Sequence, residues 1–310
     1  METYFGHKGF RSDKPIVTLG MFDGVHRGHR SLLAALVKKA GEAGTDSVVV
    51  TLDPHPRIVL SGGKCMIRYL TSLDEKISLI SEAGVDKLVV LPFTTELSRM
   101  ETCDFIKNYM VDIIGVKHLI VGYDHHFGYQ DYDSSTSISK CAGLYGFVSE
   151  RREPLKEGKE VISSTLIREK LLEGSLGTAN RMLGYPYMLK GKVVEGKKIG
   201  RLLGYPTANI VPDYSFKLIP ADGVYAVEVI LDSGEYRAML YIGPRPTIEK
   251  EKRERTIEVN IFDFDEDIYG ENIMLRFRHR LRGDTKFSSR EKLLDQIERD
   301  KEETMRLLSR

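Results

Sequence analysis

Residues 16–36, IVTLGMFDGVHRGHRSLLAAL, limit the possible folds of this chain more than any other stretch. The apolar, β-branched segment Ile16–Leu19 predicts a buried strand. Three glycines follow within nine residues, and they predict a turn whose backbone reaches conformations closed to other residues. Apolar residues then recur at helix spacing, at Leu32, Leu33, Leu36 and Val37. The stretch therefore predicts a strand, a glycine-rich turn and a helix that begins at His29 or just before it.

Such a turn is suited to binding an anion. The first N–H groups of a helix have no partner within the helix, and the helix dipole adds partial positive charge there, so phosphates bind these ends readily. His26 and His29 are three residues apart and can point to one side of the helix start. Their imidazoles can donate to phosphate oxygens. A structural turn with two exposed histidines is the alternative, but Asp23 in the same turn favours a functional site.

The pattern Gly-x-Phe-Asp-Gly-x-His-x-Gly-His over residues 20–29 resembles the His-x-Gly-His signature of the nucleotidylyltransferase superfamily. More narrowly, it resembles the adenylyltransferase half of the bacterial bifunctional riboflavin kinase/FMN adenylyltransferases, also called FAD synthetases. The resemblance implies two catalytic histidines, His26 and His29. It also implies nucleotide-binding roles for Gly20, Phe22, Asp23, Gly24 and Gly28.

The rest of the N-terminal half alternates between strand and helix patterns. Strands are expected at 16–19, 47–52, 88–91, 118–121 and 146–148, and helices at about 29–40, 72–83, 102–114, 134–143 and 164–173. The helix at 72–83 has a capping box, Ser72-x-x-Glu75. This alternation predicts a mostly parallel sheet, in which ligands bind outside the carboxyl ends of the strands at the topological switch point.

Two further loops follow expected strands. Residues 53–57 read Asp-Pro-His-Pro-Arg and resemble the family's Phe-x-Pro-x-Pro segment, with Leu52 in place of phenylalanine; a simple loop is an equal alternative. Residues 122–128 resemble the family's Gly-x-Asp-Phe-x-Phe-Gly stretch, which implies a nucleotide-binding role for Asp124. The pair His125 and His126 departs from that pattern, and without a third ligand nearby it is a weak candidate for a metal site.

A second phosphate-binding helix start is predicted at residues 162–168, Ile-Ser-Ser-Thr-Leu-Ile-Arg. Serine capping of the next helix is the simpler explanation. The run also resembles the family's Ile-Ser-Ser-Thr-x-Ile-Arg motif, which implies that Ser164, Thr165 and Arg168 hold nucleotide phosphates, with the arginine on the leaving pyrophosphate. Transfer to a phosphate that is already ionised needs positioning and charge stabilisation, and no enzyme nucleophile.

The pattern changes near Tyr185, after a segment rich in turn residues. Strands are expected at 187–194, 223–231, 236–242, 256–264 and 272–277, which favours a small antiparallel barrel. A helix is expected from Ser288, with the capping box Ser288-x-x-Glu291.

The barrel carries a second motif at residues 196–209, GKKIGRLLGYPTAN. Its glycines, Gly196, Gly200 and Gly204, predict a flap that closes over nucleotide phosphates. Thr207 and Asn209 are two apart, so on an extended segment they point to one side, where their oxygens can bind Mg²⁺. A proline-bearing barrel turn is the alternative. The motif resembles the riboflavin kinase signature Gly-[Phe/Tyr]-Pro-Thr-Ala-Asn, which adds Asn209 to the catalytic residues.

The same resemblance extends along the barrel and implies that Glu258 accepts the proton of the flavin's ribityl hydroxyl as general base. A surface-facing carboxylate is the common alternative for a glutamate in a strand. Asn260 and Tyr241 stand where histidine and asparagine are commoner in the family.

Composition excludes some functions. A net charge of +1 gives no bulk attraction to nucleic acid or membrane, and no apolar run approaches the ~20 residues of a membrane helix. The three cysteines, Cys65, Cys103 and Cys141, are far apart, which argues against a disulfide framework, and we interpret them as reduced cytosolic thiols. A cytoplasmic protein, monomeric or weakly oligomeric, is expected.

Together these patterns predict a Rossmann-like α/β domain with a parallel sheet, residues 1–184, followed by a small antiparallel β-barrel with a C-terminal helix, residues 185–310. The resemblance implies FMN adenylyl transfer in the first and riboflavin phosphorylation in the second, with riboflavin, FMN and ATP as substrates and Mg²⁺ as cofactor. Two alternatives stay open. A nucleotidylyltransferase for another acceptor would have no use for the motif at 204–209, and near-neutral charge and zero tryptophans disfavour an RNA-binding module.

Overall fold

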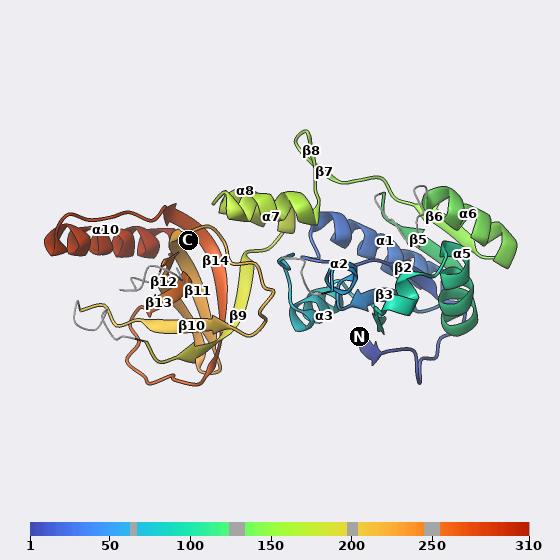
Figure 1. Cartoon of the computed structure of the whole chain (residues 1–310), viewed down its shortest axis with the longest axis horizontal. Coiled ribbons are helices and arrows are strands. Elements are labelled where there is room, and N and C mark those ends of the chain that lie inside the picture. Colours follow the sequence, from blue (N-terminus) through green and yellow to red (C-terminus); the bar gives the residue numbers. More distant parts are fainter. Residues whose placement is uncertain (63–66, 124–133, 197–203, 245–254, 310) are drawn as a thin grey trace. The chain divides into compact units, whose positions relative to one another are not determined.

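The computed structural model describes all residues except 63–66, 124–133, 197–203, 245–254 and 310. Contacts divide the chain into two compact units, Met1–Ser164 and Thr165–Arg310. The expected fold class is confirmed: a parallel sheet in the first unit and a closed antiparallel barrel with a final helix in the second (Figure 1). Within the described residues, no helix is long and apolar enough to cross a membrane.

The first unit is built on a six-stranded sheet in the order β1-β4-β3-β2-β5-β6, with every neighbouring pair parallel. From β2 the chain moves through β3 and β4 to one side, and β5 then pairs on the other side of β2. The switch point of the sheet is therefore at the carboxyl end of β2, where the glycine-rich turn begins. The strands are β1 (Glu2–Phe5), β2 (Ile16–Leu19), β3 (Ser47–Asp53), β4 (Lys87–Pro92), β5 (His118–Val121) and β6 (Val148–Arg151).

Helices cover both faces of this sheet. One face packs against α5 (Thr102–Phe105), the π-helical segment η1 (Ile106–Ile114) and α6 (Ser134–Tyr145), whose apolar side chains join those of the strands in one core cluster. On the other face lie α1 (Arg27–Ala43), which contacts β2, β3 and β5, and α3 (Leu73–Glu82), which buries Leu79 and Ile80. The expected capping box at the start of α3 is confirmed, with Ser72 and Glu75 bonding each other's backbone N–H.

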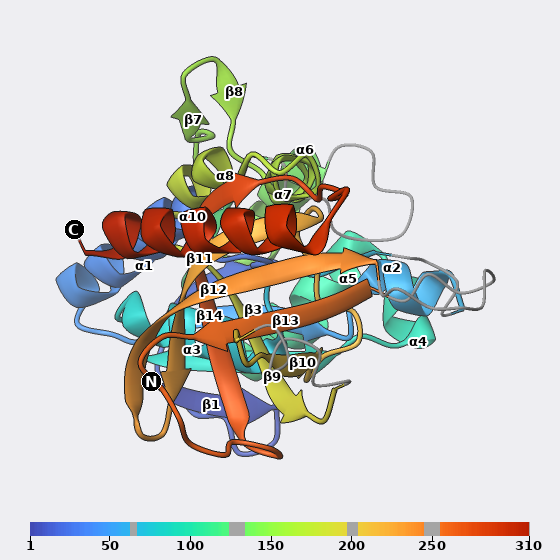
Figure 2. The same ribbon diagram turned by 90° about the vertical axis from the view of Figure 1, so that its left-hand side faces the viewer.

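The second unit contains a closed barrel in the order β10-β13-β12-β11-β14-β9. Closure leaves no unpaired edge within the described strands. Helix α10 (Arg290–Leu308) packs against β11, β12 and β14 (Figure 2). The strands are β9 (Tyr187–Val194), β10 (Ala208–Pro212), β11 (Gly223–Leu231), β12 (Gly234–Pro244), β13 (Arg255–Ile261) and β14 (Asn272–Arg282). Helix α7 (Ser164–Leu172) begins on the last residue of the first unit.

Several local expectations are wrong. The turn-rich segment before Tyr185 contains a helix, α8 (Leu176–Leu183), because Leu176, Ala179, Met182 and Leu183 form one buried apolar face. The last helix is capped by Ser289, whose hydroxyl accepts from the Lys292 N–H, and not by Ser288. Strands β1 and β10 and some short elements were not expected: α2 (Pro56–Leu60), α4 (Thr95–Ser98), β7 (Lys156–Glu157) and β8 (Glu160–Val161).

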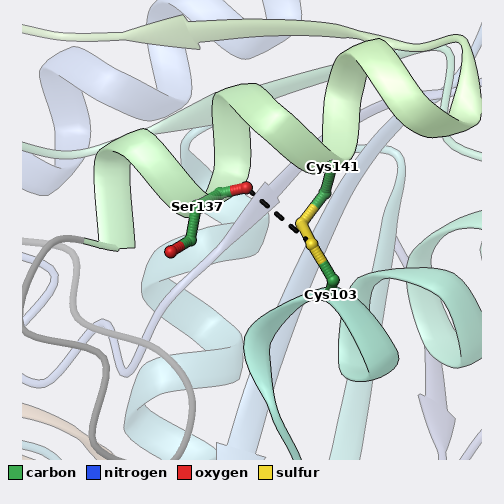
Figure 3. The surroundings of a disulfide bond; sticks show 3 residues. All are labelled: Cys103, Ser137 and Cys141. Atoms are coloured by element: carbon green, nitrogen blue, oxygen red, sulfur yellow. Dashed lines mark hydrogen bonds between the residues drawn. A yellow bond between two sulfur atoms is a disulfide. The ribbon is translucent and has the colours of Figure 1, made fainter.

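The interpretation of the cysteines as reduced thiols is wrong for two of them. Cys103 in α5 and Cys141 in α6 form a disulfide across 38 residues of sequence (Figure 3). The carbonyl oxygen of Ser137 lies 4.0 Å from the Cys103 sulfur. Sequence spacing gave no signal for this pair, because the two helices meet only when both pack on the same face of the sheet. Cys65 lies outside the described residues.

Candidate active sites

The turn after β2 has an unusual backbone. Gly24 adopts a φ of 81°, and two residues with side chains, Phe22 and Val25, have φ values of 48° and 32°. Positive φ is unfavourable for a bulky residue and strongly so for β-branched valine, and such residues cluster at functional sites. The surroundings stabilise the turn, because the Phe22 and Val25 side chains are buried in the core.

The two histidines of this turn lie against each other. His26 is the N-cap of α1, and its Nδ1 accepts a hydrogen bond of 3.3 Å from the His29 N–H. The two rings stack with centroids 3.7 Å apart, and Phe22 packs on His29 at 5.1 Å. Since Nδ1 of His26 accepts, the proton of its neutral ring is on Nε2. A Cβ on Gly28 would lie 3.1 Å from two atoms of the His26 ring, so this stacking depends on a glycine there.

Burial lowers the pKa of His29 well below its usual 6.5, and the neighbouring His26 and Lys76 lower it further. His29 is therefore a neutral imidazole near pH 7. In this form it can donate one hydrogen bond to an anionic group but adds no positive charge. The histidines are brought together as predicted, with His26 buried at 5% exposure.

Asp23 has a structural set of contacts. Its carboxylate accepts from the backbone N–H groups of Leu70 (2.9 and 3.2 Å) and Thr71 (3.1 Å). The Thr71 hydroxyl in turn accepts from the Gly24 N–H at 3.0 Å. These bonds tie the glycine-rich turn to the segment that leads into α3, and they account for the burial of Asp23 without a nucleotide. Gly20 lies at the start of the turn, where an added Cβ would be 3.1 Å from the Phe22 ring.

The motif at residues 162–168 is joined to the turn at one residue. The Ser164 hydroxyl donates to the backbone carbonyl of Asp23 at 2.9 Å, so the start of α7 lies beside the glycine-rich turn. Thr165 and Arg168 belong to the second unit, and their roles stay predictions. Asp124 lies outside the described residues, as does Gly200 of the flap.

In the barrel, the residues of the second motif converge. Asn209 on β10 is the register partner of Glu258 on β13, so the two side chains are on neighbouring strands at one level. The Thr207 hydroxyl lies 3.4 Å from one oxygen of Glu258. Thr256, two residues before Glu258 on the same strand, places its hydroxyl 3.3 Å from Asn209 Oδ1 and 3.4 Å from the other Glu258 oxygen.

The backbone around this cluster is closely fitted. A Cβ on Gly196 would overlap the side-chain amide of Asn209, so the Gly196 backbone lies directly against this residue. The side-chain amide of Asn260 donates to the Pro206 carbonyl at 2.6 Å. The asparagine therefore has a structural contact at a position where the family more often has histidine. Gly204 has a φ of 85° at the start of this segment. Tyr205 donates to Glu298 of α10, and this bond raises the pKa of Tyr205 to about 12.

A cavity of about 220 Å³ adjoins the cluster. It shares Thr207 with the candidate metal ligands. Its other lining residues come from β9, from the segment that enters β10, from β13 and from the segment after β13, which includes Phe264 and Tyr269. Thr207 and Asn209 supply neutral oxygen donors beside the Glu258 carboxylate, a donor set that suits Mg²⁺. Among the described residues no group of three or more histidine, cysteine, aspartate or glutamate side chains forms a metal site.

Two residues near these sites were missed by sequence reasoning. Thr256 bridges Asn209 and Glu258, and the available signal was alternation, which puts residues 256 and 258 of the expected strand on one face. Lys76 is buried in α3, and periodicity alone would have indicated its position on the buried face beside Leu79 and Ile80.

Comparison with known proteins also finds two parts in the chain. Residues 11–166 match the family model for FAD synthetase, and residues 183–308 match that for riboflavin kinase. Curated relatives described as bifunctional riboflavin kinase/FMN adenylyltransferase include one from Listeria monocytogenes, 36% identical over 98% of this chain and 97% of its own length. One from Bacillus subtilis is 36% identical over 96% of this chain and 93% of its own, and one from Escherichia coli K12 is 34% identical over 92% and 90%.

Among solved structures, a Streptococcus pneumoniae protein described as a macrolide-efflux protein matches with a TM-score of 0.88. It is 33% identical, and the match covers 98% of this chain and 99% of that one.

Proposed function

The chain belongs to the bifunctional riboflavin kinase/FMN adenylyltransferase family, and from this premise we propose which residues carry each of its two reactions. The enzyme phosphorylates riboflavin with ATP to give FMN, and it transfers an adenylyl group from ATP to FMN to give FAD and pyrophosphate. One observation supports a separate assignment: each compact unit holds its own cluster of polar groups, at residues 20–29 in the first and at 207–209 and 256–258 in the second.

In the first unit, the glycine-rich turn binds the ATP phosphates through the start of α1. A phosphate oxygen of FMN attacks the α-phosphorus of ATP, and the bond to the pyrophosphate oxygen breaks. Neutral His26 and His29 donate hydrogen bonds to the oxygens on which charge accumulates, and the close turn excludes water from them. Ser164, Thr165 and Arg168 hold the departing phosphates. Asp23 acts indirectly, since its carboxylate keeps the turn in its positive-φ conformation.

In the barrel, Glu258 removes the proton of the terminal ribityl hydroxyl of riboflavin, whose oxygen attacks the γ-phosphorus of ATP with ADP as leaving group. Glu258 suits this role because threonine hydroxyls lie near both of its oxygens and fix its orientation. Thr207 and Asn209 would hold Mg²⁺, which would neutralise charge on the ATP phosphates. Gly196, Gly200 and Gly204 belong to the flap over those phosphates. The adjoining cavity, which shares Thr207, takes the adenosine end of this ATP.

We further propose a division at residues 184 and 185, a protein that is monomeric or weakly oligomeric, and a cytoplasmic location without nucleic-acid or membrane partners. Dependence on ATP supports the location. The Cys103–Cys141 disulfide is the observation against it, because reducing compartments keep thiols free. Alkylation of thiols in rapidly quenched cells decides between the two.

The experiment for the residue assignment incubates each variant with Mg²⁺ and ATP, supplies riboflavin or FMN, and separates FMN from FAD by chromatography. We expect Asn209→Ala and Glu258→Ala to abolish FMN formation and to leave FAD formation from supplied FMN intact. His29→Ala and Arg168→Ala should do the reverse. Loss of both activities in a variant that still unfolds cooperatively would contradict the assignment.

A further inference from the structure

Lys76 is the most deeply buried lysine among the described residues, with 1% of its surface exposed. A buried ammonium group is costly unless it is paired or hydrogen-bonded. The described part of the chain, however, gives the Lys76 side chain no hydrogen bond and no ion pair within 4 Å. Its backbone N–H bonds the Ser72 carbonyl in the ordinary way for a helix. A lysine buried in this state calls for an anionic partner.

The position of Lys76 is fixed relative to the glycine-rich turn. The segment that leads into α3 is joined to the turn by the bonds from Leu70 and Thr71 to Asp23 and from Gly24 to Thr71. The capping box at Ser72 then fixes the first turn of α3, on which Lys76 lies. The lysine therefore belongs to the same rigid assembly as His26 and His29.

The charged and titratable groups that act on Lys76 surround the carboxyl ends of β2 and β3. They are Asp23 in the turn, Asp53 at the end of β3 and His29 at the start of α1. Burial lowers the pKa of Lys76, and the two aspartates oppose this change. Burial also raises the pKa of Asp53. The ammonium group is thus poorly hydrated, and the groups that act on it belong to the glycine-rich turn, the end of β3 and the start of α1.

Arg168 is proposed above for the departing phosphates, but the histidine His29 adds no positive charge to the site, because its pKa is too low for it to be protonated near pH 7. The two arginines of α1 closest to the turn are already engaged: Arg27 pairs with Glu157 at 2.6 Å and Arg30 with Glu82 at 3.6 Å. Lys76 has no such partner among the described residues. A positioned cation in a low-dielectric site stabilises a phosphate more strongly than one in water.

We propose that the Lys76 ammonium binds a phosphate group of the substrates in the adenylyl-transfer site, next to His29. The phosphate comes either from ATP or from FMN, and the chemistry of recognition is the same. The inference rests on the N-terminal site proposed above. It adds a residue that contacts substrate, one that the motifs of the family resemblance do not contain.

The test compares Lys76→Met with Lys76→Arg in the full-length enzyme. Methionine keeps the buried aliphatic chain and removes the charge. We expect Lys76→Met to lower kcat/KM for FAD formation by about 100-fold, the usual effect of losing one charge-stabilising contact. Riboflavin phosphorylation, which the second unit performs, should stay within about twofold, and cooperative urea unfolding checks that the first unit of the variant is folded. The matched control is Lys170→Met, which removes a lysine that forms an ion pair with Glu173, and it should form FAD at the wild-type rate.

A double variant separates phosphate binding from simple neutralisation of Asp53. If Lys76 only balances that carboxylate, Lys76→Met with Asp53→Asn recovers the lost activity, and the proposal is overturned. If Lys76 binds phosphate, the double variant stays as slow as Lys76→Met. Calorimetric titration with α,β-methylene-ATP and, separately, with FMN identifies the phosphate, since only one of the two affinities falls in Lys76→Met.

The pH profile gives an independent readout. Because burial lowers the pKa of Lys76, FAD formation should decline at high pH as the ammonium loses its proton. Lys76→Arg retains the positive charge to higher pH, so the decline should move to higher pH even if the variant's maximal rate of FAD formation differs from that of the wild type. If Lys76→Met forms FAD at the full rate while His29→Ala does not, the proposed role of Lys76 is refuted and the N-terminal site stands. Full activity in both variants refutes the proposed N-terminal site itself.

Discussion

The two sites use different parts of the chain to bind phosphate-bearing substrates. In the first unit the site is a turn at the switch point of a parallel sheet, and its features are backbone groups, positive φ angles and a helix start. In the barrel the site is made by side chains within strands, with Asn209 and Glu258 facing each other across β10 and β13. A parallel sheet places function in the loops beyond its strands, whereas an antiparallel barrel can place it on the strands themselves.

This contrast predicts that added methyl groups act differently at the two sites, and the largest effect is expected in the barrel. Gly196→Ala would force the side chain of Asn209 out of its position. Displacement of a positioning group costs about 100-fold in rate. We expect that loss in riboflavin phosphorylation, measured as FMN formed per unit time, with FAD formation from supplied FMN unchanged.

Gly41→Ala is the control for this experiment, because nothing lies within 4 Å of the added Cβ and the residue is within α1. Both activities should be retained in this variant. Normal phosphorylation by Gly196→Ala would show that Asn209 is not needed in its observed position.

The corresponding change in the first unit should be milder. A Cβ on Gly28 would lie 3.1 Å from the His26 ring, which can turn away by a small rotation. Such off-rotamer shifts cost about 1 kcal/mol, so we expect FAD formation to fall about fivefold. Steady-state rates with FMN and ATP measure this, and phosphorylation of riboflavin should not change. An unchanged FAD rate would mean that the stacking of His26 on His29 is not required.

The smallest expected effect is on how the free energy of unfolding depends on pH. Unfolded His29 takes up a proton near pH 6.5, whereas the folded site lowers its pKa well below that value. The unfolded chain therefore binds more protons below pH 6.5, so this contribution is complete above that pH and is lost as the pH falls through it. Between pH 6.5 and 5.5 the loss is about 1 kcal/mol.

Urea unfolding at the two pH values, compared between the wild type and His29→Gln, measures this contribution. The glutamine variant should lose less stability over the same interval. A tyrosine of the second unit has the opposite pH dependence. The pKa of Tyr205 is raised to about 12, so its contribution to folding stability is lost as the pH rises above 10. Equal acid sensitivity of wild type and variant would contradict the low pKa of His29.

The fold was largely predictable from local patterns. The strands at 16–19, 118–121, 187–194 and 223–231 have the expected bounds, because continuous apolar runs and alternation report burial directly. Helix α8 was missed because its glycine and polar residues hide a short apolar face. His26 and His29 stack on each other and Ser164 bonds the Asp23 carbonyl of the same turn, while the roles that the motifs imply for them stay predictions.

The contacts that the sequence could not reveal are those between distant segments. The bonds of Asp23 to Leu70 and Thr71 span 47 and 48 residues. The disulfide between Cys103 and Cys141 likewise depends on two helices that meet on one face of the sheet. Helix periodicity puts Lys76 on the same face as Leu79 and Ile80, but only the packed structure shows that its side chain has 1% of its surface exposed.

The pairing of Asn209 with Glu258 has a consequence for how the barrel tolerates change. Side chains alternate between the two faces of a strand, so a slip of a single residue between β10 and β13 would turn Glu258 away from Asn209. One inserted amino acid inside either strand should therefore inactivate the kinase while the barrel still closes. The same insertion in the connection between β11 and β12 would leave this pairing, and hence phosphorylation, untouched.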